Sequence, residues 1–157
     1  TLALGFGLVA LVTPRVLAPA SASFASEPGV WRPDTLNRLR AMHRPVLVVF
    51  TADWCVPCRW NEQAVVASAP VRAALASGGY TVLRADWTDQ EDAIRRELAR
   101  FGRAGVPLTL AYRADAREPE RLPDVLTVDT VLAALRGGPV LASRESPGET
   151  AAQAEAE

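Results

Sequence analysis

Hydrophobic residues form one uninterrupted run in the middle of the chain, and weaker strand patterns follow it. The run "PVLVVFT" at 45–51 is apolar and rich in β-branched residues, which predicts a strand buried on both faces. "YTVLRA" at 80–85 and "PLTLAY" at 107–112 predict two further strands. A short strand near 119–123 is expected at an edge of the sheet, because Pro123 cannot donate a backbone hydrogen bond.

Helical periods separate these strands. A helix is expected at 34–43, with Asp34 as its cap and Leu36, Leu39 and Met42 facing inward. Four more helical segments are predicted: one from the cysteines to about Ala67, one opened by Pro70, one started by a capping box "TDQE" at 88–91, and one at 127–136. The element order β-α-β-α-β-β-α predicts an α/β fold with a mixed central sheet flanked by helices.

Four stretches of different composition divide the chain. Residues 1–13 are apolar and indicate the end of a transmembrane helix or a trimmed signal peptide, whereas 14–29 form a linker rich in Pro, Ala and Ser. The folded domain is predicted at 30–136. Residues 137–157 are rich in Gly, Pro, Ala and Glu, which favours a disordered tail.

Charge and cysteine content narrow the possible functions. The chain has 157 residues and a formal net charge of −1, so no strong field points toward nucleic acid. Its two cysteines are too few for a disulfide scaffold or, with a single histidine, for a structural zinc site. A disulfide across so short a loop restrains the unfolded chain little. A redox-active pair is the remaining interpretation of Cys55 and Cys58.

The position of the two cysteines favours disulfide exchange. Cys55 falls where the strand at 45–51 ends and a helix begins, so unpaired backbone N–H groups and the helix dipole favour its thiolate. Cys58 lies one turn further along and is shielded. Cys55 is therefore the expected nucleophile and Cys58 the resolving cysteine, while Pro57 stiffens the segment between them.

Glu62 and the Val106–Pro107 bond are further candidates. Glu62 follows Cys58 by four residues, so the two share a helix face, and its carboxylate could accept the proton of Cys58 or simply face solvent. Pro107 precedes a strand and is a candidate for a cis peptide bond, which would expose the backbone of Val106 to a partner strand. Trp54 is a candidate docking residue or a packing residue.

Two stretches together resemble a known family. "VLVVFTADWCVPCRWNE" followed by "GVPLTLAY" resembles the thioredoxin superfamily, and within it the C-terminal periplasmic thioredoxin-like domain of DsbD-type thiol:disulfide interchange proteins. The resemblance covers about 30–136. It implies a thioredoxin-like fold, a cis peptide before Pro107, an exposed attacking Cys55, a resolving Cys58 and a proton-handling Glu62.

The resemblance also implies partners and a location. A domain of this kind takes electrons from a membrane-embedded donor domain and passes them to disulfide-bearing proteins, including isomerases and cytochrome c maturation proteins. It lies tethered on the periplasmic side of the bacterial inner membrane and needs no cofactor, because the sulfurs hold the electrons. One departure is clear: the buried Asp that the family carries six residues before the first cysteine is replaced by Val49.

Three functions remain open from the sequence. The first is a membrane-tethered reductant of extracytoplasmic protein disulfides. The second is a separately secreted thioredoxin-like protein, and the third is a non-catalytic binding module with a permanent disulfide. Trp60 and Trp87 are expected to pack rather than to act.

Overall fold

The computed structural model describes residues 28–138. The predicted apolar segment at 1–13, the linker up to residue 27 and the tail from residue 139 lie outside these described residues. The elements in chain order are β1 (Gly29–Val30), α1 (Pro33–Ala41), β2 (Val46–Thr51), α2 (Val56–Trp60), the π-helix η1 (Asn61–Val66), α3 (Ala69–Ser77), β3 (Thr81–Asp86), α4 (Asp92–Arg100), β4 (Leu108–Tyr112), β5 (Glu120–Arg121) and α5 (Val128–Arg136).

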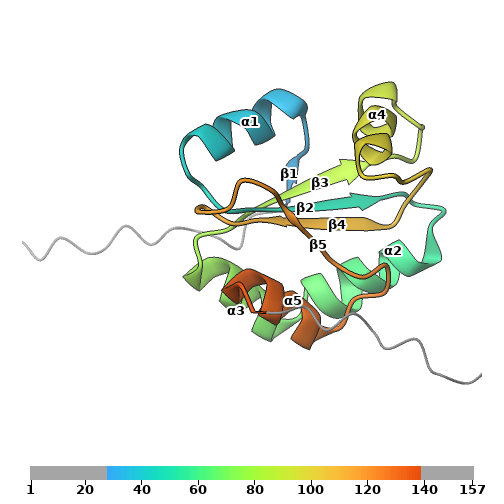
Figure 1. Ribbon diagram of the computed structural model, residues 1–157. Coiled ribbons are helices and arrows are strands. Elements are labelled where there is room, and N and C mark those ends of the chain that lie inside the picture. Colours follow the sequence, from blue (N-terminus) through green and yellow to red (C-terminus); the bar gives the residue numbers. More distant parts are fainter. Residues whose placement is uncertain (1–27, 139–157) are drawn as a thin grey trace, which may run out of the picture.

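A five-stranded sheet in the order β1-β3-β2-β4-β5 divides the domain into two helical layers. Strands β1, β3 and β2 run parallel, whereas β4 is antiparallel to both β2 and β5. Helices α1 and α4 cover one face of the sheet, and α2, η1, α3 and α5 cover the other (Figure 1). The predicted α/β fold with a mixed sheet between helices is confirmed.

Strand β2 is the centre of the hydrophobic core. All six of its residues are buried, as the continuous apolar run predicts. Val46, Val48 and Phe50 join the core under α1 and α4, and Leu47 and Val49 join the core under η1, α3 and α5. This alternation follows from the two-residue period of a strand, so both layers are anchored on the element that leads to Cys55.

The first strand was not predicted. Gly29 and Val30 are exposed and pair in parallel with β3, and the backbone N–H of Trp31 continues the ladder to the carbonyl of Arg84 at 2.9 Å. Two residues are too few to show a strand period, and an exposed edge does not require an apolar pattern.

Two predicted helix starts are wrong. Pro33 rather than Asp34 begins α1, no side chain caps that helix, and Met42 is 56 % exposed at its end. Helix α4 begins at Asp92, so the stretch at 88–91 is no capping box. The physical reason is that the Thr88 hydroxyl has other partners, which belong to the site described below.

The helix after the cysteines changes its winding. It was expected to run as one helix to about Ala67, but α2 gives way after Trp60 to η1, in which the N–H of Ala67 reaches back five residues to Glu62 at 2.9 Å. Short π-helical turns of this kind are frequent at functional sites. Val65 is buried on the face predicted for it.

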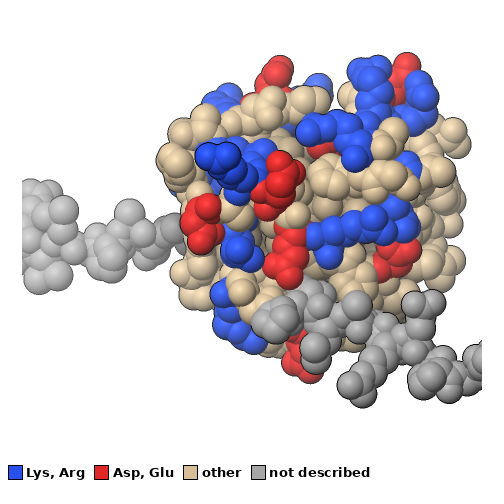
Figure 2. Space-filling view, in the orientation of Figure 1, with Lys and Arg blue, Asp and Glu red and all other residues tan. Residues whose placement is uncertain are grey.

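The surface carries both signs of charge. Arginine and acidic side chains lie interspersed on the face shown in Figure 2, and neither sign gathers into a large patch there. Within residues 28–138 no helix has the length and apolar character needed to cross a membrane.

Candidate functional site

Cys55 caps the N-terminus of α2. Its backbone is extended, with φ −91° and ψ 100°, and its Sγ accepts the N–H of Cys58 at 3.3 Å. The two cysteines form a disulfide with their Cα atoms 5.3 Å apart. The sequence places the pair here because buried β2 ends at Thr51 and Pro57 suits the first turn of a helix.

The exposure of the two sulfur-bearing residues differs from expectation. In this disulfide form Cys55 is 5 % exposed and Cys58 is 1 % exposed. The expectation of an exposed Cys55 is therefore wrong for the oxidised state, because its sulfur is tied to Cys58 and both residues pack with Ala52 and Val106. Cys55 is still the outer member of the pair.

The bond between Val106 and Pro107 is cis, as the resemblance implied. Pro107 directly precedes β4, whose first residue, Leu108, pairs with Phe50 at the end of β2. The cis bond therefore lies at the end of the sheet where β2 leads to Cys55, and Val106 packs against the two cysteines. Four of the predicted site residues thus lie together: Cys55, Cys58, Val106 and Pro107.

Glu62 lies in the first turn of η1, which continues α2, and takes part in a polar cluster. One oxygen, Oε2, accepts the hydroxyl of buried Thr51 at 3.1 Å, and Oε1 pairs with Nε of Arg84 at 2.7 Å. Its side chain is 25 % exposed. Val49, six residues before Cys55, is buried and lies beside Arg84 in the strand register.

Arg84 connects three carboxylates. Besides Glu62, it pairs with Asp86 on its own strand and with Asp53 of the loop before Cys55, the latter at 3.6 Å. Burial alone lowers the pKa of Arg84, but hydrogen bonds to Glu62 and Asp86 outweigh it and raise the pKa above its ordinary value. The guanidinium therefore remains a fixed positive charge beside the cysteine loop.

Thr88 braces the loop that carries the cysteines. Its hydroxyl accepts the N–H of Asp53 at 2.9 Å and bonds to Asp86, and its carbonyl accepts Nε1 of Trp54 at 3.3 Å. Trp54 also lies against Trp87, with ring centroids 6.1 Å apart. Trp54 remains 54 % exposed beside Cys55, whereas Trp87 is buried as expected.

Acid should weaken this brace. Partial burial raises the pKa of Asp86, but hydrogen bonds from Thr88 and Arg84 outweigh it and hold the pKa below its ordinary value of 3.8. A depressed carboxyl pKa stabilises the folded state above about pH 4 and loses that contribution as pH falls through the folded value. Urea unfolding between pH 2 and 6 should show a smaller acid loss for Asp86→Asn than for the parent. The exposed Asp89→Asn serves as control, and equal acid losses in the parent and Asp86→Asn would contradict the brace.

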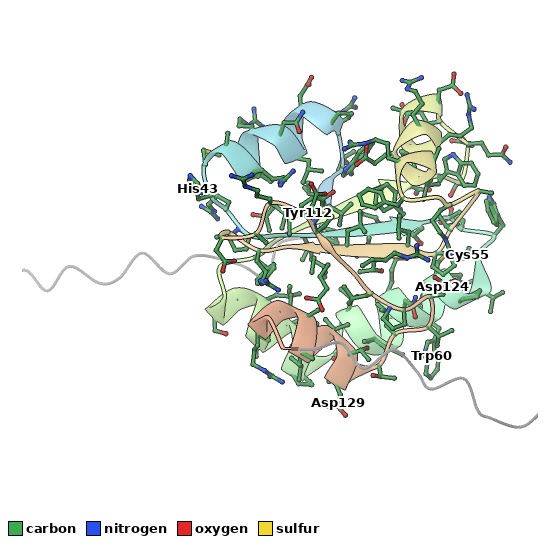
Figure 3. The ribbon with its side chains drawn as sticks, viewed as in Figure 1. His43, Cys55, Trp60, Tyr112, Asp124 and Asp129 are labelled. Atoms are coloured by element: carbon green, nitrogen blue, oxygen red, sulfur yellow. A yellow bond between two sulfur atoms is a disulfide. The ribbon has the colours of Figure 1, made fainter. Side chains whose placement is uncertain are left out.

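Asn61 is a structural residue of the site that the sequence did not reveal. It is 1 % exposed, donates Nδ2–H to the carbonyl of Asp124 at 2.7 Å, and accepts the N–H of Leu126 at 2.9 Å. The loop before α5 is thereby held against the start of η1. Asp124, Trp60 and Cys55 accordingly lie at the same end of the domain (Figure 3).

Removing this clamp should be costly. Asn61→Ala deletes two hydrogen bonds and leaves the carbonyl of Asp124 and the N–H of Leu126 unpaired, so the free energy of unfolding should fall by about 2–4 kcal/mol. Chemical denaturation measures the change. Asn37→Ala, at an exposed position of α1, should change it by less than about 0.5 kcal/mol. Equal effects of the two variants would refute the clamp.

Trp60 was expected to pack, but it is 60 % exposed, because the winding of α2 turns it away from both cores. His43 lies at the end of the domain opposite Cys55 (Figure 3). Within residues 28–138 no group of three or more His, Cys, Asp or Glu residues is arranged to hold a metal ion.

Comparisons with known proteins agree with this geometry. The family described as Thioredoxin-like matches residues 29–114. The thiol:disulfide interchange protein DsbD of Ralstonia nicotianae is 39 % identical over 104 residues, which cover 66 % of this chain and 17 % of that protein. DsbD 1 of Pseudomonas aeruginosa is 34 % identical over 95 residues, which cover 55 % and 16 %. The chain thus spans less than a fifth of either relative.

Solved structures show the same fold. The C-terminal domain of Neisseria meningitidis DsbD in its oxidised form superposes with a TM-score of 0.57 at 18 % identity, covering 72 % of this chain and all of that domain. A thioredoxin from Thermus thermophilus gives a TM-score of 0.57 at 23 % identity, covering 71 % and 86 %. Since the family match spans more than half of the sequence, the chain belongs to the thioredoxin-like family, and Cys55 and Cys58 give it the site of a disulfide oxidoreductase.

Proposed function

We propose that this chain is a thiol:disulfide oxidoreductase in which Cys55 attacks and Cys58 resolves. The observation that carries the proposal is the position of Cys55 as the N-cap of α2, where its Sγ already accepts the N–H of Cys58. The same N–H stabilises a thiolate after reduction, together with the positive end of the helix dipole. Cys58 is more deeply buried and cannot meet a partner first.

The exchange consists of two displacements. The Cys55 thiolate attacks one sulfur of a partner disulfide, forms a mixed disulfide and releases the partner's other sulfur as a thiolate. Cys58 then loses its proton and attacks Sγ of Cys55. The Cys55–Cys58 bond forms and the second partner thiolate leaves, so the partner gains two electrons and the chain loses two. The partner's two thiols take up the proton released by Cys58 and one proton from solvent.

Glu62 is the group we assign to the proton of Cys58. It lies four residues beyond Cys58 on the same continuous helical segment, and the hydroxyl of Thr51 and the guanidinium of Arg84 orient its two oxygens. Thr51 directly precedes Ala52, which packs on both cysteines. A carboxylate held here can accept the proton during resolution and return it in the reverse direction.

The partner's backbone should lie along Val106. Ala52, Cys58 and Val106 pack with Cys55, and Trp54 beside it is exposed. Pro57 lies between the two cysteines and Pro107 follows the cis bond, and neither proline has an N–H group. An extended partner segment can bond to the free backbone of Val106 while its disulfide faces Cys55. This surface suits disulfide-bearing proteins or domains rather than a small charged substrate.

The finer assignment is a reductant of extracytoplasmic disulfides. Its support is the similarity to DsbD of two species, named as thiol:disulfide interchange proteins. On this assignment a membrane-embedded domain supplies the electrons, and the chain is tethered on the periplasmic side of the inner membrane. The acceptors are isomerases or cytochrome c maturation proteins. A secreted protein of the same fold would share the site but not the donor.

A stoichiometric reduction tests the proposal. The reduced full chain, freed of reductant, is mixed with insulin, and free thiols of insulin are counted against re-formed Cys55–Cys58. One insulin disulfide should open for each pair oxidised, and Cys55→Ser should open none. A chain whose own disulfide resists dithiothreitol while folded, or a reduced chain that leaves insulin intact, would instead support a binding module.

A further inference from the structure

We propose that Arg84 is a positioning residue for proton transfer at Cys58, acting through the carboxylate of Glu62. The inference rests on the proton-handling role proposed above for Glu62. Arg84 comes from β3, a strand that carries none of the predicted site residues, and it faces Glu62 across the layer between sheet and helix. It is not a catalytic residue, because it does not touch a cysteine.

The contacts of Arg84 hold the carboxylate of Glu62 in one orientation, beyond balancing its charge. Nε points at Oε1 of Glu62 at 2.7 Å, while the two terminal nitrogens are directed to Asp86 and Asp53. The guanidinium is therefore held by three carboxylates. If Glu62 changed rotamer, Arg84 could not move with it without breaking its other two ion pairs. The other oxygen of Glu62 is held by Thr51 at 3.1 Å. The carboxylate of Glu62 is therefore held at both of its oxygens.

The same pair lines a cavity that is separate from the cysteine surface. The cavity measures about 490 Å³ and lies between β3, η1 and α3; Val49, Glu62, Arg72 and Arg84 line it, but neither cysteine nor Pro107 does. Glu62 can therefore exchange its proton with solvent while a partner covers Cys55. The charged groups that face this site are Glu62 from η1, Arg84 and Asp86 from β3, Asp53 from the loop before α2 and Arg72 from α3.

Strand β2 places no acid beside Arg84. Val49 is the partner of Arg84 in the strand register and carries no charge, so Glu62 is the acid that Arg84 meets on the helix side. Within residues 28–138 no ion pair joins any other basic side chain to Glu62. The position of the proton acceptor should then depend on Arg84.

The test reads attack and resolution separately. Reduced full chain is mixed in a stopped-flow instrument with 5,5′-dithiobis(2-nitrobenzoate), which releases one coloured thiolate when Cys55 attacks and a second when Cys58 resolves. In Arg84→Gln the second phase should slow about tenfold, because the carboxylate of Glu62 is no longer held in position for the proton of Cys58. The first phase should change less than about twofold. Arg84→Lys should restore most of the second-phase rate.

The chain offers a matched control. Like Arg84, Arg113 pairs with more than one carboxylate, here Asp115 and Glu120. Its side chain is 33 % exposed against 31 % for Arg84. It follows β4 at the end of the sheet opposite Cys55. Arg113→Gln should leave both phases unchanged. In a Glu62→Gln background, Arg84→Gln should add no further slowing.

The outcomes separate the two proposals. If Glu62→Gln leaves the second phase unchanged, the proton role of Glu62 is wrong and the inference falls with it. If Glu62→Gln slows that phase but Arg84→Gln slows it no more than Arg113→Gln, only the role of Arg84 is wrong. An Arg84→Gln variant that slows both phases alike, and that Arg84→Lys does not rescue, shows a structural role and overturns the inference.

Discussion

Replacing Cys58 by serine should turn a transient complex into a stable one. Cys55 can still attack a partner disulfide, but the second displacement is lost, so the mixed disulfide accumulates. Non-reducing gel electrophoresis of reduced Cys58→Ser mixed with excess insulin should show nearly all of the chain in a covalent adduct that dithiothreitol releases. The parent should show almost none, because resolution is fast.

The complementary variant sets the direction of attack. Cys55→Ser leaves Cys58 as the sole thiol, and Cys58 is only 1 % exposed in the disulfide form. It should form no adduct above the level of a serine double variant, and reduction of insulin should fall to the rate of buffer alone. If Cys55→Ser were trapped as efficiently as Cys58→Ser, the roles of the two cysteines would have to be exchanged or abandoned.

The second large effect is expected at Glu62. Glu62→Gln keeps the size of the side chain but cannot accept a proton, so resolution of the mixed disulfide should slow by about a hundredfold. The loss should be greatest below pH 8, where the thiol of Cys58 needs an acceptor, and should diminish toward pH 9, where hydroxide takes the proton. The second phase of the stopped-flow reaction measures it.

Glu120→Gln is the matched control for this change. Glu120 also pairs with an arginine, and its side chain is 24 % exposed against 25 % for Glu62, but it lies on β5 away from the cysteines. It should leave both phases within about twofold. Identical resolution rates of Glu62→Gln and the parent from pH 6 to 9 would remove Glu62 from the mechanism.

The sequence was sufficient for the elements that carry the cysteines. A short continuous apolar run rich in β-branched residues is typical of a strand covered on both faces, and β2 is such a strand. The predicted position of Cys55 at a helix N-terminus was therefore correct. Helix α3 also opens near Pro70 with Val71 and Leu75 buried. In both elements a pattern of neighbouring residues in the sequence is enough to predict the structure.

The support of the site was not visible in the sequence. Asn61 and Thr88 bond to backbone groups of other loops, and Arg84 meets Glu62 only after β3 is laid beside β2. Such contacts depend on strand register and on the change of winding at η1, which no local pattern encodes. The capping box at 88–91 failed for the same reason, because Thr88 is committed to a distant loop.

The thiol of Cys55 is the point on which the account depends most directly. The reduced Cys58→Ser variant should be titrated by its rate of alkylation with iodoacetamide between pH 5 and 10, with urea-unfolded protein as reference. Half-maximal reactivity of folded protein should fall at a pH below that of free cysteine, about 8.5, because the N-terminus of α2 favours the thiolate. A midpoint equal to or above that of the unfolded chain would contradict the proposal that this cysteine is the nucleophile.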